Sequence, residues 1–190
     1  MIKKYLFILL CLCIFGCGPR SSIGKITIPI AGEEITLVWV DGGSFIMGSS
    51  ELIANSDEKP THKIHIDGFW MTETPITNNQ FTAFVNSTNY VTTAEKAPSL
   101  EEMMLQLPKG SPPIPDEFLV PGSLVFIAGR AAATSYSSID WWKWSPNTNW
   151  KSPRLENPTL DGFGDHPVVH VSWYDATEFS LWSGMQLPTE

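Results

Sequence analysis

Residues 165–190, with the sequence DHPVVHVSWYDATEFSLWSGMQLPTE, decide the fold of this chain. The apolar run HPVVHVSW carries a proline near its start, which predicts a strand that leads into a helix. That helix is expected over residues 172–183, because Asp175 lies in its first turn, where the helix dipole favours an acid, and Gly184 suits its C-terminal end. Thr189 is suited to cap a following helix, so we expect the domain to continue beyond this stretch.

Short strands are predicted closer to the N-terminus. Residues 25–30 and 35–40 alternate or are apolar, with Gly32-Glu33 between them, which predicts a hairpin. Residues 44–48 (SFIMG) predict a further strand. Residues 61–69 (THKIHIDGF) alternate cleanly, so one face should carry His62, Ile64 and Ile66, and the other Lys63, His65 and Asp67.

A first helix is predicted over residues 77–86 (TNNQFTAFVN). Thr77 is suited to the N-cap, Gln80 follows three residues later as in a capping box, and Phe81 and Phe84 fall on one stripe.

The middle of the chain is less regular. Residues 98–121 are rich in proline and predict an excursion over the surface, with a short helical stretch at 100–107. Residues 122–128 predict a strand, and an irregular stretch follows that contains Trp141, Trp142, Trp144 and Trp150. We therefore predict a mixed α/β fold (α+β, rich in coil) with short strands and few helices.

The N-terminus predicts an export signal. Residues 1–16 contain two lysines and no acid, and an apolar run at 6–14 precedes Gly16-Cys17. The sequence IFGC at 14–17 resembles a bacterial lipobox, which makes Cys17 the expected site of lipid attachment, with residues 17–24 as a flexible tether. Because Phe15 is bulky for a lipobox, an ordinary signal peptide with an incidental cysteine is the alternative. We expect an exported, membrane-anchored lipoprotein that faces the periplasm or the cell surface.

Charge and cysteine content exclude some functions. Removal of residues 1–16 takes two of the 12 bases and none of the 20 acids, and such an acidic chain is a poor partner for nucleic acid. All three cysteines lie at or before residue 17, so the exported chain has no internal disulfide. We identify no catalytic residue and no metal ligand in this chain.

The histidines and tryptophans are weak candidates for a site. His62 and His65 lie three apart on a strand and therefore face opposite sides, so they are not expected to share a metal ion. His166 and His170 are expected on one face of a strand, as packing residues rather than ligands. Trp141, Trp142 and Trp144 are candidates to line a peptide groove, because tryptophan offers a large contact area. The alternative is that they fill a loop-rich core.

Several segments, in order along residues 35–190, resemble the formylglycine-generating enzyme (sulfatase-modifying factor) family. They are residues 42–48 (GGSFIMG), 62–84, 84–96 (FVNSTNYVTTAEK), 122–126, 141–153 (WWKWSPNTNWKSP) and 165–190. The resemblance implies that family's fold, which is distantly similar to C-type lectins. Two positions depart from the pattern: Gln186 stands where the family usually has arginine, and Ser180 where some members have a disulfide cysteine.

The resemblance also implies a chemistry. Members of the family oxidise a cysteine of an unfolded sulfatase polypeptide, within Cys-x-Pro-x-Arg, to formylglycine using oxygen. They use a cysteine pair that binds copper(I), together with structural calcium, and these ligands lie in the part of the family domain beyond Glu190. Residues 25–190 are therefore expected to form a partial domain, and the chain by itself is expected to be inactive.

Three functions follow as hypotheses. The first is the N-terminal part of an exported formylglycine-generating enzyme, an oxidoreductase that matures sulfatases. The second is a non-catalytic lipoprotein module of the same fold, which binds or scaffolds a partner. The third is a lectin-like ligand-binding domain, for which the sequence shows no carbohydrate-site motif.

Overall fold

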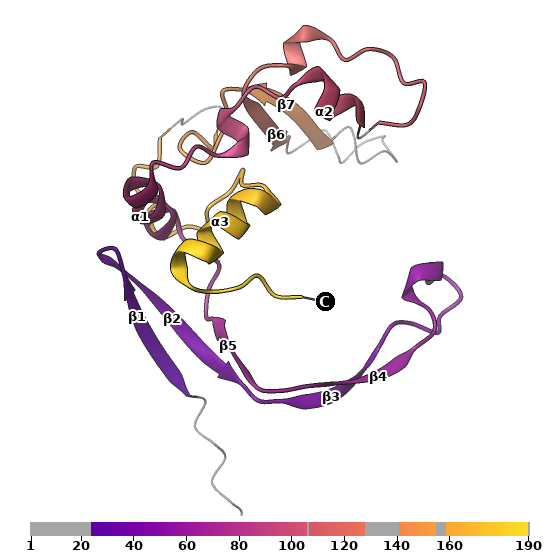
Figure 1. Ribbon diagram of the computed structural model, residues 1–190, viewed down its shortest axis with the longest axis vertical. Coiled ribbons are helices and arrows are strands. Elements are labelled where there is room, and N and C mark those ends of the chain that lie inside the picture. The colour runs from indigo at the N-terminus through magenta and orange to yellow at the C-terminus, as the bar shows by residue number, and fades with distance from the viewer. Residues whose placement is uncertain (1–23, 106, 128–140, 155–158, 190) are drawn as a thin grey trace, which may run out of the picture.

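The computed structural model describes residues 24–105, 107–127, 141–154 and 159–189. The predicted signal and Cys17 lie outside these residues. The described chain is a mixed α/β structure of small sheets and short helices, which confirms the predicted fold class. In Figure 1 it has the outline of a C, with α1 and α3 in its middle and a two-stranded ribbon in each arm.

The first sheet has the strand order β1-β2-β5, all antiparallel. Its strands are β1 (Lys25–Ile30), β2 (Glu33–Val40) and β5 (Phe69–Thr72). Ala31 and Gly32 connect β1 to β2 with φ angles of 48° and 91°, and two positive φ values suit the twist of a tight hairpin. The predicted hairpin is confirmed, but its turn lies one residue earlier than Gly32-Glu33.

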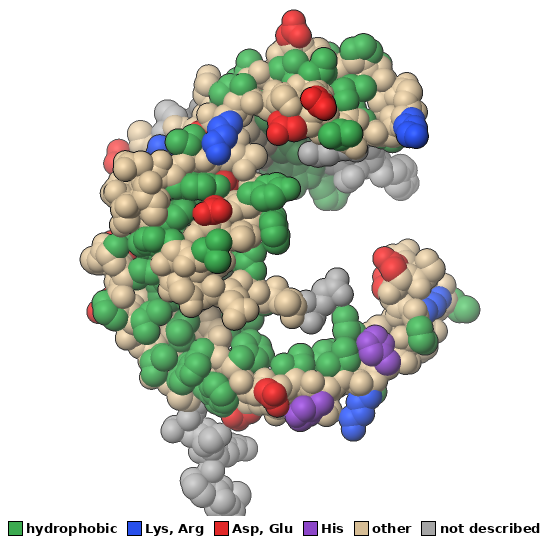
Figure 2. Space-filling model, in the orientation of Figure 1, with side chains coloured by type: hydrophobic (Ala, Val, Ile, Leu, Met, Phe, Trp, Pro, Cys, Tyr) green, Lys and Arg blue, Asp and Glu red, His purple; other side chains and the backbone are tan. Residues whose placement is uncertain are grey.

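A two-stranded ribbon forms the lower arm of the molecule. It pairs β3 (Gly43–Met47) with β4 (His62–Ile66), and the register places Phe45 opposite Ile64. Directly opposite residues share a face, so one face carries Phe45 and Ile64 and the other carries Ser44 and His65, as the alternation predicted. Figure 2 shows hydrophobic side chains along the concave side of this ribbon.

Helices α1 (Asn78–Thr88) and α3 (Trp173–Ser183) begin at capping boxes. The Thr77 hydroxyl accepts from the Gln80 amide, and the Gln80 side chain accepts from the Thr77 amide at 2.9 Å. Ser172 and Asp175 make the equivalent pair at α3. Each box satisfies two backbone donors that a helix start leaves open, which explains why both helices begin where predicted. Gly184 ends α3 with a φ of 70°, as predicted for this position.

The core lies between α1, α3 and one face of the first sheet. Phe81 is the centre of an aromatic cluster, with ring centroids 5.3 Å from Phe84, 5.1 Å from Trp150 and 6.0 Å from Phe179. Such ring pairs add to the free energy gained from burial alone. The buried core residues are Ile35, Leu37, Phe81, Phe84, Trp150 and Phe179.

The upper arm contains a second ribbon, built by β6 (Gly122–Phe126) and β7 (Trp142–Pro146). Three short elements precede it in the sequence: η2 (Thr93–Glu95), α2 (Leu100–Leu105) and η3 (Asp116–Phe118). A further short helix, η1 (Ser56–Glu58), lies between β3 and β4 of the lower arm. The expectation of an irregular backbone over the tryptophan stretch was wrong for β7. Strand β7 forms because it pairs with β6. The two strands are distant in sequence, and the composition of residues 142–146 alone does not predict this pairing.

The strand predicted before α3 was also wrong. Over residues 166–172 the described pairing is a single bridge of Pro167 to Thr77, together with a 2.9 Å bond from the Val168 amide to the Ile76 carbonyl. His170 then takes a left-handed conformation with a φ of 58°, which a strand does not accommodate. His166 and His170 therefore do not share a strand face.

Candidate functional site

An apolar cavity is built on one face of the β6–β7 ribbon. Its volume is about 830 Å³, within the range of small-molecule and peptide clefts. The ribbon register stacks Phe126 with Trp142 and Leu124 with Trp144 on this face. Because alternate residues point to opposite sides, the same face holds Trp142 and Trp144 while Ser145 is buried beneath it. We call this cavity the tryptophan pocket; its lining residues are Met103, Glu117, Phe118, Leu124, Trp142, Lys143, Trp144 and Pro146.

Segments distant in sequence supply the opposite wall. Met103 comes from α2, and Glu117 and Phe118 come from η3. The proline-rich segment of residues 98–121 was predicted to run over the surface, and three of its residues line the tryptophan pocket. Of the three tryptophans predicted to line a groove, Trp142 and Trp144 line the pocket. Trp141 does not line it; its carbonyl accepts from the Ile127 amide at 2.9 Å and its ring lies 6.4 Å from Phe126.

Gly122 permits the position of the Trp144 indole. A Cβ atom on Gly122 would lie 2.5 Å from the Ser145 carbonyl oxygen and 3.0 Å from Cζ2 of Trp144. Any side chain at this position would therefore displace either the β7 backbone or the indole. The Trp144 Nε1 atom is buried and has no hydrogen-bond acceptor among the described residues, a condition that costs about 1–3 kcal/mol in proteins.

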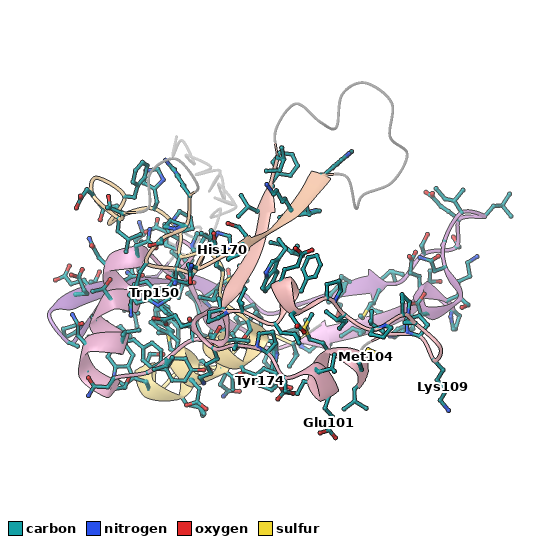
Figure 3. The ribbon with its side chains drawn as sticks, turned by 90° about the horizontal axis from the view of Figure 1, so that it is seen from above. Glu101, Met104, Lys109, Trp150, His170 and Tyr174 are labelled. Carbon is teal, nitrogen blue, oxygen red and sulfur yellow. The ribbon has the colours of Figure 1, made fainter. Side chains whose placement is uncertain are left out.

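His170 fixes the β6–β7 ribbon to the rest of the molecule. Its Nε2 lies 3.1 Å from the Pro153 carbonyl oxygen and its Nδ1 lies 2.9 Å from Oγ of Ser123 on β6. A carbonyl only accepts, so Nε2 carries the proton; in the neutral ring Nδ1 then accepts from the Ser123 hydroxyl. Figure 3 shows His170 beside the ribbon, between it and the packed part that contains Trp150.

Two carboxylates hold the segment that leads toward the tryptophan pocket. Asp175 is fully buried and accepts from the Tyr90 hydroxyl at 2.9 Å and from the Thr93 amide at 3.0 Å. Burial and this hydrogen bond from its hydroxyl to Asp175 raise the pKa of Tyr90 to about 12. Sequence analysis identified Asp175 only as a helix-start residue, and nothing in the local pattern indicates its link to residues 90–93.

Glu95 is the second of these carboxylates. It accepts from Lys151 Nζ at 2.7 Å, from the Thr92 amide at 3.0 Å and from Nε1 of Trp150 at 3.3 Å. Burial alone would raise the pKa of Glu95, but the hydrogen bonds from Lys151 and Thr92 outweigh it and hold the pKa below its ordinary value.

The other histidines are not part of this site. His62 lies 3.2 Å from the Pro60 carbonyl oxygen and His65 lies 3.1 Å from Oγ of Ser44, on opposite faces of the lower ribbon. His166 is exposed and packs edge-on against Phe163 at 5.0 Å. Among the described residues no group of three or more His, Cys, Asp or Glu side chains is placed to hold a metal ion.

The described residues do not fit a copper(I) centre of thiolates, since every cysteine of this sequence lies at or before residue 17. They also offer no cluster of carboxylates for calcium. The tryptophan pocket presents an apolar, aromatic surface with one acid, Glu117, and one base, Lys143.

Residues 30–190 match the family described as "Sulfatase-modifying factor enzyme 1-like domain". The formylglycine-generating enzyme of Mycobacterium tuberculosis is 34% identical over 81% of this chain and 48% of its own length. The enzyme of the same name from Streptomyces coelicolor is 33% identical over 90% of this chain and 46% of its own length.

A third relative, the mouse protein named inactive C-alpha-formylglycine-generating enzyme 2, is 28% identical over 90% of this chain and 48% of its own length. The chain spans about half the length of these curated relatives. The match over residues 30–190 shows that the chain belongs to the sulfatase-modifying factor enzyme 1-like family.

Proposed function

We propose that this chain is the N-terminal part of a formylglycine-generating enzyme, and that its tryptophan pocket binds the sulfatase polypeptide to be modified. The observation that carries the proposal is an apolar cavity of about 830 Å³, with two tryptophans on one ribbon face, in a chain of this family. Tryptophan is enriched where proteins bind polypeptides, because it offers a large rigid area and one donor.

The reaction proposed for the whole protein is oxidation of the cysteine in Cys-x-Pro-x-Arg to formylglycine with oxygen. The copper(I) that this family chemistry implies would need thiolates that the described residues do not contain. This chain's own contribution is therefore to bind and orient the peptide. A peptide fixed in one geometry reacts faster than a free one, because the loss of entropy has already occurred on binding.

The test is a binding titration that follows tryptophan fluorescence and the indole NMR signals. A synthetic peptide with Cys-x-Pro-x-Arg should bind the chain, and the same composition in scrambled order should bind more weakly. Trp142→Leu should weaken binding about tenfold or more, since it removes an exposed aromatic wall. Trp173→Leu is the matched control, because Trp173 is exposed on α3 and does not line the pocket. Equal binding by wild type and Trp142→Leu would contradict the proposal.

The same chain, incubated with the peptide, copper and oxygen, should form no aldehyde above a copper-only control. The reason is that Cys17 is the only cysteine left after removal of residues 1–16, and the redox step needs two thiolates held together. Aldehyde formation above the control, detected by mass spectrometry, would show that the chain carries a chemistry of its own.

A second candidate is a non-catalytic binding module of the same fold. It is favoured by the lack of thiols in the described residues and by the relative named as inactive. The coding sequence downstream of Glu190 discriminates between the two functions. A nearby pair of cysteines would support the enzyme, and their absence would support the binding module.

We also propose that the protein is an exported lipoprotein held by lipid on Cys17. The support is the basic, apolar and small-residue pattern of residues 1–17. No described helix is long and apolar enough to cross a bilayer. Two acyl chains on one cysteine give stable anchoring where one chain is marginal. Cys17→Ser should move the protein from the membrane fraction of an expressing bacterium to the soluble or unprocessed pool, and a wild-type protein already in the soluble fraction would contradict this.

A further inference from the structure

We propose that the first sheet contacts the lipid surface of the membrane through the face opposite the core. This outer sheet face is defined by Val38, Val40, Phe69 and Met71. The inference rests on the proposed lipid anchor and goes beyond it, because it assigns a second, non-covalent membrane contact to the folded part of the chain. It is independent of the proposed activity toward a sulfatase.

The outer sheet face is apolar where β2 ends and β5 begins. Alternation along β2 directs its side chains away from Leu37, which is in the core, and α1 and α3 lie on the core side in Figure 1. Phe69 is 39% exposed and Met71 is 42% exposed. An antiparallel sheet usually exposes polar side chains on the face opposite its core, so an apolar outer face indicates a surface that contacts something other than water.

The N-terminal segment joins the sheet beside this face. The Gly24 carbonyl accepts from the Trp39 amide at 2.8 Å, which pairs Gly24 with β2 between Val38 and Val40. Gly24 follows Cys17 by seven positions, and seven residues span at most about 25 Å. A lipid on Cys17 therefore keeps the outer sheet face near the bilayer. So short a connection gives the face a high effective concentration at the membrane, and even a weak contact is then populated.

The contact is expected to be apolar rather than electrostatic. Side chains of both signs border the outer sheet face: Lys25 forms an ion pair with Glu73, and Asp67 lies 3.8 Å from His65. An anionic headgroup is therefore attracted and repelled by neighbouring side chains, and salt screens both effects. Burial of apolar side chains at the boundary between headgroups and acyl chains does not depend on this attraction. We expect the contact to persist at raised salt concentration.

Photolabelling from the bilayer tests the proposal. Cys17 is the only cysteine left after removal of residues 1–16, so a lipid with a maleimide headgroup attaches the exported chain there, whether or not the cell acylates it. The vesicles consist of phosphatidylethanolamine and phosphatidylglycerol, with a small fraction of a lipid that carries a diazirine near the top of its acyl chain. Mass spectrometry locates the labelled residues. We expect more label on Phe69 and Met71 than on Leu181, although Leu181 is 68% exposed on α3.

Matched variants separate this contact from general exposure. Replacement of both Phe69 and Met71 by serine should lower the labelling of residues 38–40 and 69–71 about tenfold, because two apolar side chains no longer gain from burial. Leu181→Ser is the control and should leave this labelling unchanged. A cooperative urea transition of each variant shows that it is folded.

The outcomes distinguish the membrane contact from the lipid anchor. Equal labelling of Phe69, Met71 and Leu181, or label confined to residues 17–23, would overturn the contact and leave the anchor intact. Strong labelling of Met71 in these vesicles, together with a wild-type protein that the bacterium leaves without lipid, would support the contact and overturn the anchor alone. A dimer in solution in which Met71 is protected from label would assign the outer sheet face to a second copy and overturn the proposal.

Discussion

Replacement of Asp175 by alanine should destabilise the chain more than any other single loss of a charge in the described residues. Asp175 is fully buried and joins the start of α3 to residues 90–93. It accepts from the Ser172 amide at 2.6 Å, from the Tyr90 hydroxyl at 2.9 Å and from the Thr93 amide at 3.0 Å. Truncation to alanine removes the carboxylate that accepts these three hydrogen bonds.

The magnitude follows from these contacts. Loss of a capping interaction at a helix start costs about 1 kcal/mol. The Tyr90 hydroxyl and the Thr93 amide, whose hydrogen bonds to Asp175 are part-buried, lose this acceptor, at about 1 kcal/mol each. We therefore expect Asp175→Ala to lower the free energy of unfolding by roughly 3 kcal/mol or more. Asp175→Asn should cost less, because its remaining oxygen still accepts.

Urea unfolding followed by tryptophan fluorescence measures the effect. Glu178→Ala is the control, because Glu178 is an exposed acid on the same helix and its loss should change the free energy of unfolding by less than about 0.5 kcal/mol. An Asp175→Ala variant as stable as Glu178→Ala would refute the reasoning that Asp175 connects these elements.

Three further predictions concern acid stability, the pocket and the lower ribbon. The folded pKa of Glu95 lies below its ordinary value of 4.5, so its contribution to stability is present above pH 4.5 and is lost as the pH falls through the folded pKa. Glu95→Gln should therefore reduce the loss of stability at acidic pH, and an unchanged loss would contradict this prediction. Gly122→Ala should shift the indole NMR signal of Trp144 and weaken peptide binding, because the added Cβ has no space; unchanged signals would show that the ribbon relaxes freely. Phe45→Ser should lower the binding of a hydrophobic dye such as ANS, because Phe45 is 45% exposed on the apolar face of the β3–β4 ribbon. Lys63→Ser changes the other face and should leave dye binding unchanged, so equal dye binding by both variants would contradict the assignment of faces.

The elements predicted correctly from the sequence are those that short-range patterns specify, such as helix-end residues and the alternation of apolar and polar residues. The capping-box pattern at Thr77, the placement of Asp175 and Gly184 at the two ends of residues 172–183, and the alternation through residues 61–69 were sufficient to predict α1, α3 and β4. The predicted strand at 122–128 was confirmed as β6, although the described strand ends at Phe126. The short helix predicted at 100–107 was confirmed as α2 and ends at Leu105.

The elements that depend on distant partners were not predictable. Strand β7 forms because the WKWSP sequence pairs with β6, and residues 166–172 leave the strand conformation because their hydrogen bonds go to Ile76, Asn78 and Ser123. The tryptophans suggested a peptide groove only because this residue type offers a large contact area, and the sequence did not indicate where the groove lies. Its opposite wall, from α2 and η3, follows from tertiary packing of a proline-rich segment that has no periodic signal.

Photo-cross-linking tests the central claim, that the tryptophan pocket binds the sulfatase polypeptide, most directly. A motif peptide that carries a benzophenone group next to its cysteine is irradiated with the purified chain, and the cross-linked residues are located by mass spectrometry. The account predicts cross-links in the pocket wall, with Met103 and Trp142 as the expected sites, and their suppression by excess unlabelled peptide. Suppressible cross-links confined to the β3–β4 ribbon, or cross-links that excess peptide does not suppress, would contradict it.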